Sequence, residues 1–143
     1  MAIVAFNYLK FDSEKKKGSS KGGEIEVKHN LSIQNVEKMP LQLAGSKTDV
    51  LRIEFDFDIL YGKELGKIGI KGDVVYTDTK EIIDETMKGW ESDKDLNMTV
   101  KSQVHKFVYN KSIVKGIQIA DDLGLPSPVP MPKFKYPSGE NKK

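Results

Sequence analysis

The segment Leu51–Ile59 alternates apolar and polar side chains without interruption. Every second residue is a leucine, isoleucine or phenylalanine, and the residues between them are charged. A repeat of two residues is typical of a β-strand that buries one face and exposes the other. The apolar face must then be covered by the same chain, by another copy of it or by a different polypeptide.

Three further segments have strand patterns. Residues 2–12 are rich in β-branched and aromatic types, and residues 24–33 alternate in the same way as the first segment. A fourth strand pattern occupies residues 65–78. The segments predicted as loops or connections are 13–23, which is polar and glycine-rich, 37–48, which contains Pro40 and Gly45, and 61–64.

The third and fourth strands are predicted to form a hairpin. With Tyr61–Glu64 as a four-residue loop, the numbers of opposite residues sum to 125. Both faces are then self-consistent, with apolar pairs on one and opposite charges on the other. The predicted pairs are Phe57 with Ile68, Phe55 with Ile70, Leu51 with Val74, Asp58 with Lys67 and Glu54 with Lys71.

Glu54, Asp56 and Asp58 form a row of carboxylates on the polar face of the third strand. Such a row could bind a metal ion or perform acid–base chemistry. The predicted register, however, places a lysine opposite two of the three. We therefore interpret the row as a charge-paired face in contact with solvent.

Two helices follow the strands. Residues 79–92 place apolar residues on one stripe after Thr79, a residue type that caps helix N-termini. A longer helix is predicted over residues 97–124, starting after Asn97 and ending at Gly124. The fold class is therefore α+β, with four strands followed by a short and a long C-terminal helix.

The long helix has two apolar stripes, which predicts burial on two sides. A single helix layer on a four-stranded sheet leaves one stripe in water unless another subunit covers it. The alternative is that the C-terminal arm covers this stripe. The first stripe is Val100, Val104, Phe107 and Val114, and the second, predicted as an oligomer interface, is Tyr109, Ile113, Ile117 and Ala120.

The arm at residues 125–137 contains five prolines. Proline excludes helix and central strand, so the arm is predicted to be extended and close to polyproline II. Its prolines recur every second residue rather than every third, which favours a packed arm over a ligand for a proline-reading domain. Residues 1–137 are predicted as one domain, and 138–143 as a flexible basic tail.

Composition narrows the class of protein further. The chain has 143 residues, no cysteine and a net charge of only +2 although 31% of its residues are charged. This balance argues against a nucleic-acid binder. No secretory signal or apolar run of about 20 residues occurs, so membrane insertion is not expected and a cytoplasmic protein is predicted.

Candidate catalytic and metal-binding chemistry is sparse. His29 lies on the apolar face of a strand, and His105 lies in the middle of the long helix. Neither histidine stands in a metal-ligand spacing, and cysteine ligands are absent. No nucleotide-binding or nucleophile motif occurs. We therefore predict a protein that is not an enzyme and has no cofactor or metal ion.

The order strand–loop–strand–connection–hairpin–short helix–long helix–proline arm resembles that of the SecB family of protein-export chaperones. Four segments are each similar to the corresponding part of that family, and together they span nearly the whole chain. They are YLKFDSE (8–14), GEIEVKHNL (23–31), DVLRIEFDF (49–57) and GLPSPVPMP (124–132).

The resemblance implies a four-stranded antiparallel sheet backed by helices, and dimers that pair into a tetramer through the long helices. It also implies ATP-independent holding of unfolded polypeptide along an apolar groove. Long, shallow apolar surfaces bind extended segments without strict sequence readout. The residues expected in this groove, each of which could equally belong to an ordinary core, are Val27, His29, Leu31, Ile33, Met87 and Trp90.

Two features depart from the family. The loop SEKKKGSSKGG (13–23) lacks the aromatic and aliphatic residues that roof the family's groove. The chain is also mildly basic where the family is strongly acidic, which argues against docking to the export motor ATPase. Some members guard antitoxins instead, so the client need not be an exported protein.

Three functions remain open from the sequence. The first is a SecB-like holdase for export or antitoxin protection. The second is an oligomeric scaffold or adaptor that binds no client. The third is a small-ligand domain, which requires a closed pocket of roughly 300 Å³ or more.

Overall fold

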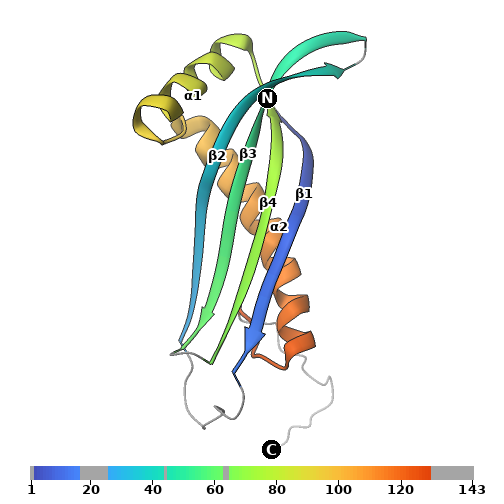
Figure 1. The fold of residues 1–143 in the computed structure, drawn as a ribbon, viewed down its shortest axis with the longest axis vertical. Helices are drawn as coiled ribbons and strands as arrows, with labels where there is room; N and C mark the ends of the chain where they lie inside the picture. Colours follow the sequence, from blue (N-terminus) through green and yellow to red (C-terminus); the bar gives the residue numbers. More distant parts are fainter. Residues whose placement is uncertain (1, 17–25, 44, 63–64, 130–143) are drawn as a thin grey trace, which may run out of the picture.

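The chain folds into a four-stranded sheet with two helices on one face (Figure 1). A computed structural model describes residues 2–16, 26–43, 45–62 and 65–129. The predicted basic tail, most of the predicted polar loop and the arm beyond Val129 lie outside the described residues. The predicted α+β class is confirmed.

The sheet is antiparallel throughout, in the order β1-β4-β3-β2, so β1 and β2 are its edge strands. The bounds are β1 Ala2–Lys15, β2 Val27–Leu43, β3 Ser46–Tyr61 and β4 Gly66–Thr77. β1 is longer than predicted because Ser13–Lys15 continue to pair with Gly66–Ile68 of β4.

The prediction of a connection at residues 37–48 was wrong. β2 and β3 instead continue as a long hairpin that pairs through Leu43 and Ser46, with Gly45 in the turn at a φ of 80°. Pro40 is tolerated because β2 is an edge strand, where a residue without an N–H need not donate to a second neighbour. The hairpin arm extends past the end of β4 at the top of the sheet (Figure 1).

The predicted register of β3 and β4 was wrong by two residues. Opposite residues sum to 127, so that Phe57 pairs with Ile70 and Leu51 with Tyr76. The loop begins one residue later than predicted because Gly62, at a φ of 51°, takes the left-handed turn position while Tyr61 stays in the strand. A shift of two residues keeps every side chain on its predicted face.

Both helices begin and end close to the predicted residues. α1 spans Lys80–Asp93, and the Thr79 hydroxyl accepts a hydrogen bond from the amide of Ile82. α2 spans Met98–Leu123, is capped by the Asn97 side chain and ends at Gly124 with a φ of 73°.

α2 crosses one face of the sheet diagonally, from β2 beside α1 to the end of β1 (Figure 1). Its buried line runs through every fourth residue and includes small residues. A Cβ at Gly116 would lie 2.7 Å from Ile59 Cδ1, so glycine permits this close approach. The buried residues of α2 are Val100, Val104, Val108, Ser112, Gly116 and Ala120.

The prediction that Val114 faces a buried side was wrong, because its side chain is 57% exposed. The inward direction of α2 drifts along its length, since residues four apart advance by more than a full turn. Val114 therefore lies opposite the buried line, although an i, i+7 spacing relates it to Phe107.

Candidate functional site

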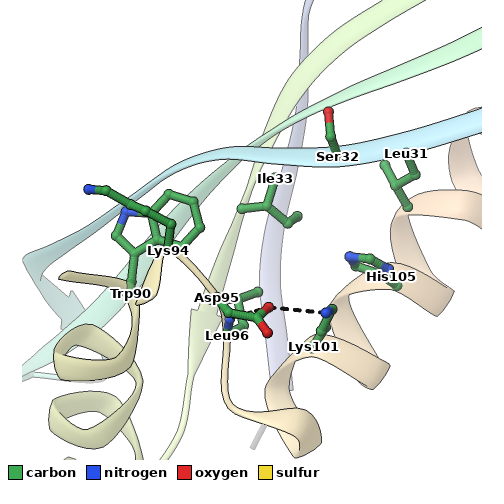
Figure 2. Close-up of a pocket in the computed structure, with 9 residues that line it drawn as sticks. All are labelled: Leu31, Ser32, Ile33, Trp90, Lys94, Asp95, Leu96, Lys101 and His105. Atoms are coloured by element: carbon green, nitrogen blue, oxygen red, sulfur yellow. Dashed lines mark hydrogen bonds and ion pairs between the residues drawn. The ribbon is translucent and has the colours of Figure 1, made fainter. Parts of the chain in front are cut away.

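A cleft of about 200 Å³ lies between β2, α2 and the α1–α2 connection. Figure 2 shows Leu31 and Ile33 pointing from β2 toward the helices and Ser32 pointing the opposite way. Trp90 of α1 and Leu96 of the connection complete the apolar lining. The alternation of β2 thus supplies one wall, because every second side chain faces the helices.

A second cleft, of about 400 Å³, adjoins the first along β2. The two clefts share Leu31 and His105, and Phe57 and Tyr109 form the apolar floor and wall of the second. We call the two together the β2–α2 furrow. Its described lining is His29, Asn30, Leu31, Ser32, Ile33, Phe57, Trp90, Lys94, Asp95, Leu96, Lys101, His105, Lys106 and Tyr109.

Charged groups form the rim of the furrow. Lys101 Nζ lies 3.0 Å from Asp95 Oδ1, and this hydrogen bond is the main reason why the pKa of Asp95 is lowered (Figure 2). Lys94 Nζ lies over the Trp90 ring, 5.5 Å from its centroid. Burial, reinforced by nearby Lys101, lowers the pKa of His105, so this imidazole is neutral at neutral pH.

At its other end the furrow meets the segment that follows α2. His29 Nε2 lies 2.8 Å from the Pro128 carbonyl oxygen, and His29 Nδ1 lies 3.1 Å from the Tyr109 hydroxyl. A carbonyl can only accept, so Nε2 carries the proton and Nδ1 accepts from Tyr109.

A second hydroxyl holds the same segment. Tyr61 donates to the Pro126 carbonyl oxygen at 2.6 Å. Burial raises the pKa of Tyr61 to about 12, so its hydroxyl remains a donor throughout the physiological range.

Four of the residues predicted for the groove line the furrow, namely His29, Leu31, Ile33 and Trp90. The other two are Val27 and Met87, which are half-buried and pack against the core. Sequence reasoning missed Leu96 and His105. A usable signal existed for His105, because it precedes Tyr109 by one helical turn and so shares a face with it.

The predicted oligomer stripe divides between different environments. Ala120 is only 1% exposed and lies within the protomer. Tyr109 binds His29, and Ile113 packs against the core, while Ile117 is half-buried. The contact of Tyr109 with His29, which also holds Pro128, favours the alternative that the C-terminal arm covers part of this stripe.

The opposite face of the sheet carries the acidic row, paired differently from the prediction. Lys71 binds Asp56 at 3.1 Å rather than Glu54, and Glu54 binds Arg52 at 2.9 Å. Asp58 lies opposite Gly69 rather than Lys67, which follows from the shifted register. Among the described residues, no cluster of three or more His, Cys, Asp or Glu residues is placed to hold a metal ion.

No family model matches the sequence, and no curated protein matches it either. A search of solved structures finds a SecB-like chaperone of Mycobacterium tuberculosis, in complex with a peptide from an antitoxin. The alignment covers 96% of this chain and 92% of that chain, with a TM-score of 0.59 and 9% sequence identity.

The chain has the SecB-like fold. The resemblance that the order of elements and the local segments indicated is therefore confirmed for the fold. The SecB-like fold places the furrow between an edge strand and the long helix. Neither described helix is long and apolar enough to cross a membrane.

Proposed function

We propose that the protein is an ATP-independent holdase that binds extended, unfolded polypeptide in the β2–α2 furrow. The observation that carries the proposal is an open apolar furrow, lined by Leu31, Ile33, Phe57 and Trp90, that the described part of the chain leaves partly unfilled. An extended chain can place alternate side chains into such a furrow without a fixed sequence.

The SecB-like neighbour supports a polypeptide as the client, because that protein is in complex with a peptide from an antitoxin. The rim of the furrow adds a preference. Lys94, Lys101 and Lys106 surround an apolar floor, with Asp95 as their acidic neighbour. Clients with an acidic residue beside an apolar stretch are therefore favoured over strongly basic ones.

The open form of the furrow argues against the small-ligand alternative, which requires a closed pocket. The scaffold alternative keeps one supporting observation. Val4, Leu9 and Phe11 of the β1 edge strand are more than a third exposed. This edge favours self-association, and we propose a homo-oligomer, a dimer of dimers, located in the cytoplasm and acting without catalysis.

The test is a light-scattering assay with a chemically denatured client, accompanied by a sizing measurement. The wild type is expected to suppress aggregation at near-stoichiometric amounts. Leu31→Asp is expected to weaken client binding about tenfold or more, because burying a leucine side chain contributes about 2 kcal/mol. Leu60→Asp is the matched control, since it makes the same substitution at an exposed position of β3 on the face away from the helices.

Aggregation that proceeds unchanged in the presence of a well-folded oligomer would defeat the holdase proposal in favour of the scaffold. Equal losses in the two aspartate variants would place client binding outside the furrow. A monomer on the sizing column would remove the proposed assembly without affecting the furrow.

A further inference from the structure

The lower corner of the helical face, between the start of β2, the end of β3 and the second half of α2, is not covered by α2. We call it the β2 corner. The chain's own residues 125–129 lie there. Leu125 is 6% exposed and packs on Gly66 of β4, where a Cβ would lie 3.0 Å from its Cδ2 atom. Pro128 is also buried.

Besides these buried side chains, the corner holds the segment through its backbone. Tyr61 and His29 donate to the carbonyl oxygens of Pro126 and Pro128, which are two residues apart. The residue between them, Ser127, is exposed and bonds only within the segment, to Val129. Its hydroxyl donates to the Val129 carbonyl oxygen and accepts from the Val129 amide, so it contributes to the shape of the segment.

Prolines suit such a site for a physical reason. Each proline presents a carbonyl but has no N–H, so burying it beside hydrogen-bond donors leaves no unsatisfied amide. Two donors that bind alternate carbonyls therefore match a segment with proline at every second position. The sequence continues this alternation at Pro130 and Pro132.

We propose that the β2 corner is a binding site for polypeptide with prolines at alternate positions, that residues 125–129 of the same chain fill it, and that a client displaces them. The client step rests on the proposed function. His29 links the two regions, because it lines the furrow and also holds Pro128. Residues 125–129 thus form the end of the furrow at His29.

Release of the segment lengthens the available surface. From Ile33 to His29 the strand spans about 13 Å, and from Ile33 to Val27 about 20 Å, at roughly 3.3 Å per residue. An extended client then contacts about seven residues of β2, from Val27 to Ile33, instead of the five from His29 to Ile33. Because a client must first displace residues 125–129, its apparent affinity is lowered by the free energy of that displacement. Short or weakly apolar clients are therefore not bound.

The first experiment tests the corner without any client. The probe is a fluorescein-labelled free peptide with the sequence LPSPVPMP, that of residues 125–132. Pro128→Asp is expected to release residues 125–129 from the corner, because an unpaired carboxylate is costly to bury. The two donors, Tyr61 and His29, are unchanged in this variant. This full-length variant is expected to bind the peptide at least tenfold more tightly than the wild type. Ser127→Asp puts the same charge at the adjacent exposed position and keeps an acceptor for the Val129 amide, so it is expected to stay within about threefold of the wild type.

A second pair of variants identifies the donor. Adding Tyr61→Phe to Pro128→Asp is expected to weaken peptide binding about fivefold, the factor for one net hydrogen bond. Adding Tyr8→Phe instead is the control, because Tyr8 also donates to a backbone carbonyl, that of Lys111, but on the β1 side of α2. Peptide binding that is no tighter in Pro128→Asp, or equal in the two tyrosine variants, would overturn the corner as a binding site.

The third measurement repeats the titration with an unfolded, carboxymethylated client protein. Tighter client binding by Pro128→Asp than by Ser127→Asp supports displacement. Equal client binding with intact peptide binding would overturn displacement alone. A wild type that binds no client would overturn the proposed function. The peptide titration would still test whether the β2 corner is a binding site.

Discussion

The diagonal α2 leaves two corners of the sheet uncovered, and only one of them is covered by another described segment of the chain. The β2 corner is filled by residues 125–129, which bring two hydrogen bonds and a buried proline. The opposite corner, between Ile3 of β1 and residues 103–110 of α2, is an open cleft of about 370 Å³ among the described residues. We call it the β1 corner.

The difference shows what is needed to cover a corner of this sheet. α2 ends at Gly124 beside β1, where Lys15 Nζ donates to the Gly124 carbonyl oxygen at 3.3 Å. The chain must then cross to the β2 side, so the segment after the helix passes over the β2 corner. No described segment passes over the β1 corner, which instead has an edge strand with exposed Val4 next to it.

The largest expected contrast concerns two phenylalanines, Phe57 in the furrow next to the β2 corner and Phe107 at the β1 corner. Phe57→Ala is expected to lower the free energy of unfolding by about 3–5 kcal/mol, because its side chain is fully buried against Tyr109 and His29. Phe107→Ala is expected to cost less than half as much, since Phe107 is only half-buried. Urea unfolding measures both, and equal costs would mean that the β1 corner is covered as well as the β2 corner.

A smaller contrast is expected between the two apolar anchors. Leu125→Ala is expected to cost about 2 kcal/mol, because Leu125 is buried and fills the space beside Gly66. Ile3→Ala, at the rim of the β1 corner, is expected to cost about 1 kcal/mol. Thermal or urea unfolding distinguishes them, and an Ile3 variant that is the more damaged of the two would reverse the comparison.

An effect confined to alkaline pH is also expected. The folded pKa of Tyr61, about 12, exceeds its unfolded value of about 10, so the folded state retains a proton that the unfolded state has lost. This contribution is complete below pH 10 and falls by about 2 kcal/mol as the pH rises toward 12. Tyr61→Phe is expected to remove this slope, as measured by urea unfolding at pH 8 and at several alkaline values.

The pH comparison has an internal reference. The pKa of Tyr76 is also raised, mainly by burial and further by its hydrogen bond to Asp78, and Tyr76 is unchanged in the variant. Its alkaline slope therefore cancels in the difference between the two proteins. Parallel curves for the wild type and Tyr61→Phe would contradict the burial of the Tyr61 hydroxyl beneath residues 125–129.

The helices were the most predictable part of the fold. Thr79, Asn97 and Gly124 act at the positions where the sequence predicted caps, because capping depends on residues only a few positions apart. The strand patterns also assigned faces correctly in β2 and β3. The register failed by two residues because it depends on which residue starts a turn, and Gly62 rather than Tyr61 does so.

The candidate site was half predictable. The β2 wall followed from alternation, so His29, Leu31 and Ile33 were found, and the short helix supplied Trp90. The opposite wall was not found, because Leu96 lies in a connection without periodicity and only packing brings it near β2. The long β2–β3 hairpin was missed for a related reason, since Pro40 breaks a central strand but not an edge strand.

By itself the sequence determined which side chains share a face and where each helix begins and ends, because periodicity and caps act over a few residues. Tertiary structure alone decided the crossing of α2 over the sheet and the covering of the two corners. The contact between His29 and Pro128 joins residues 99 positions apart, and no local pattern specifies such a pair. The extent of open apolar surface is set by these distant contacts, and the proposed client furrow depends on it.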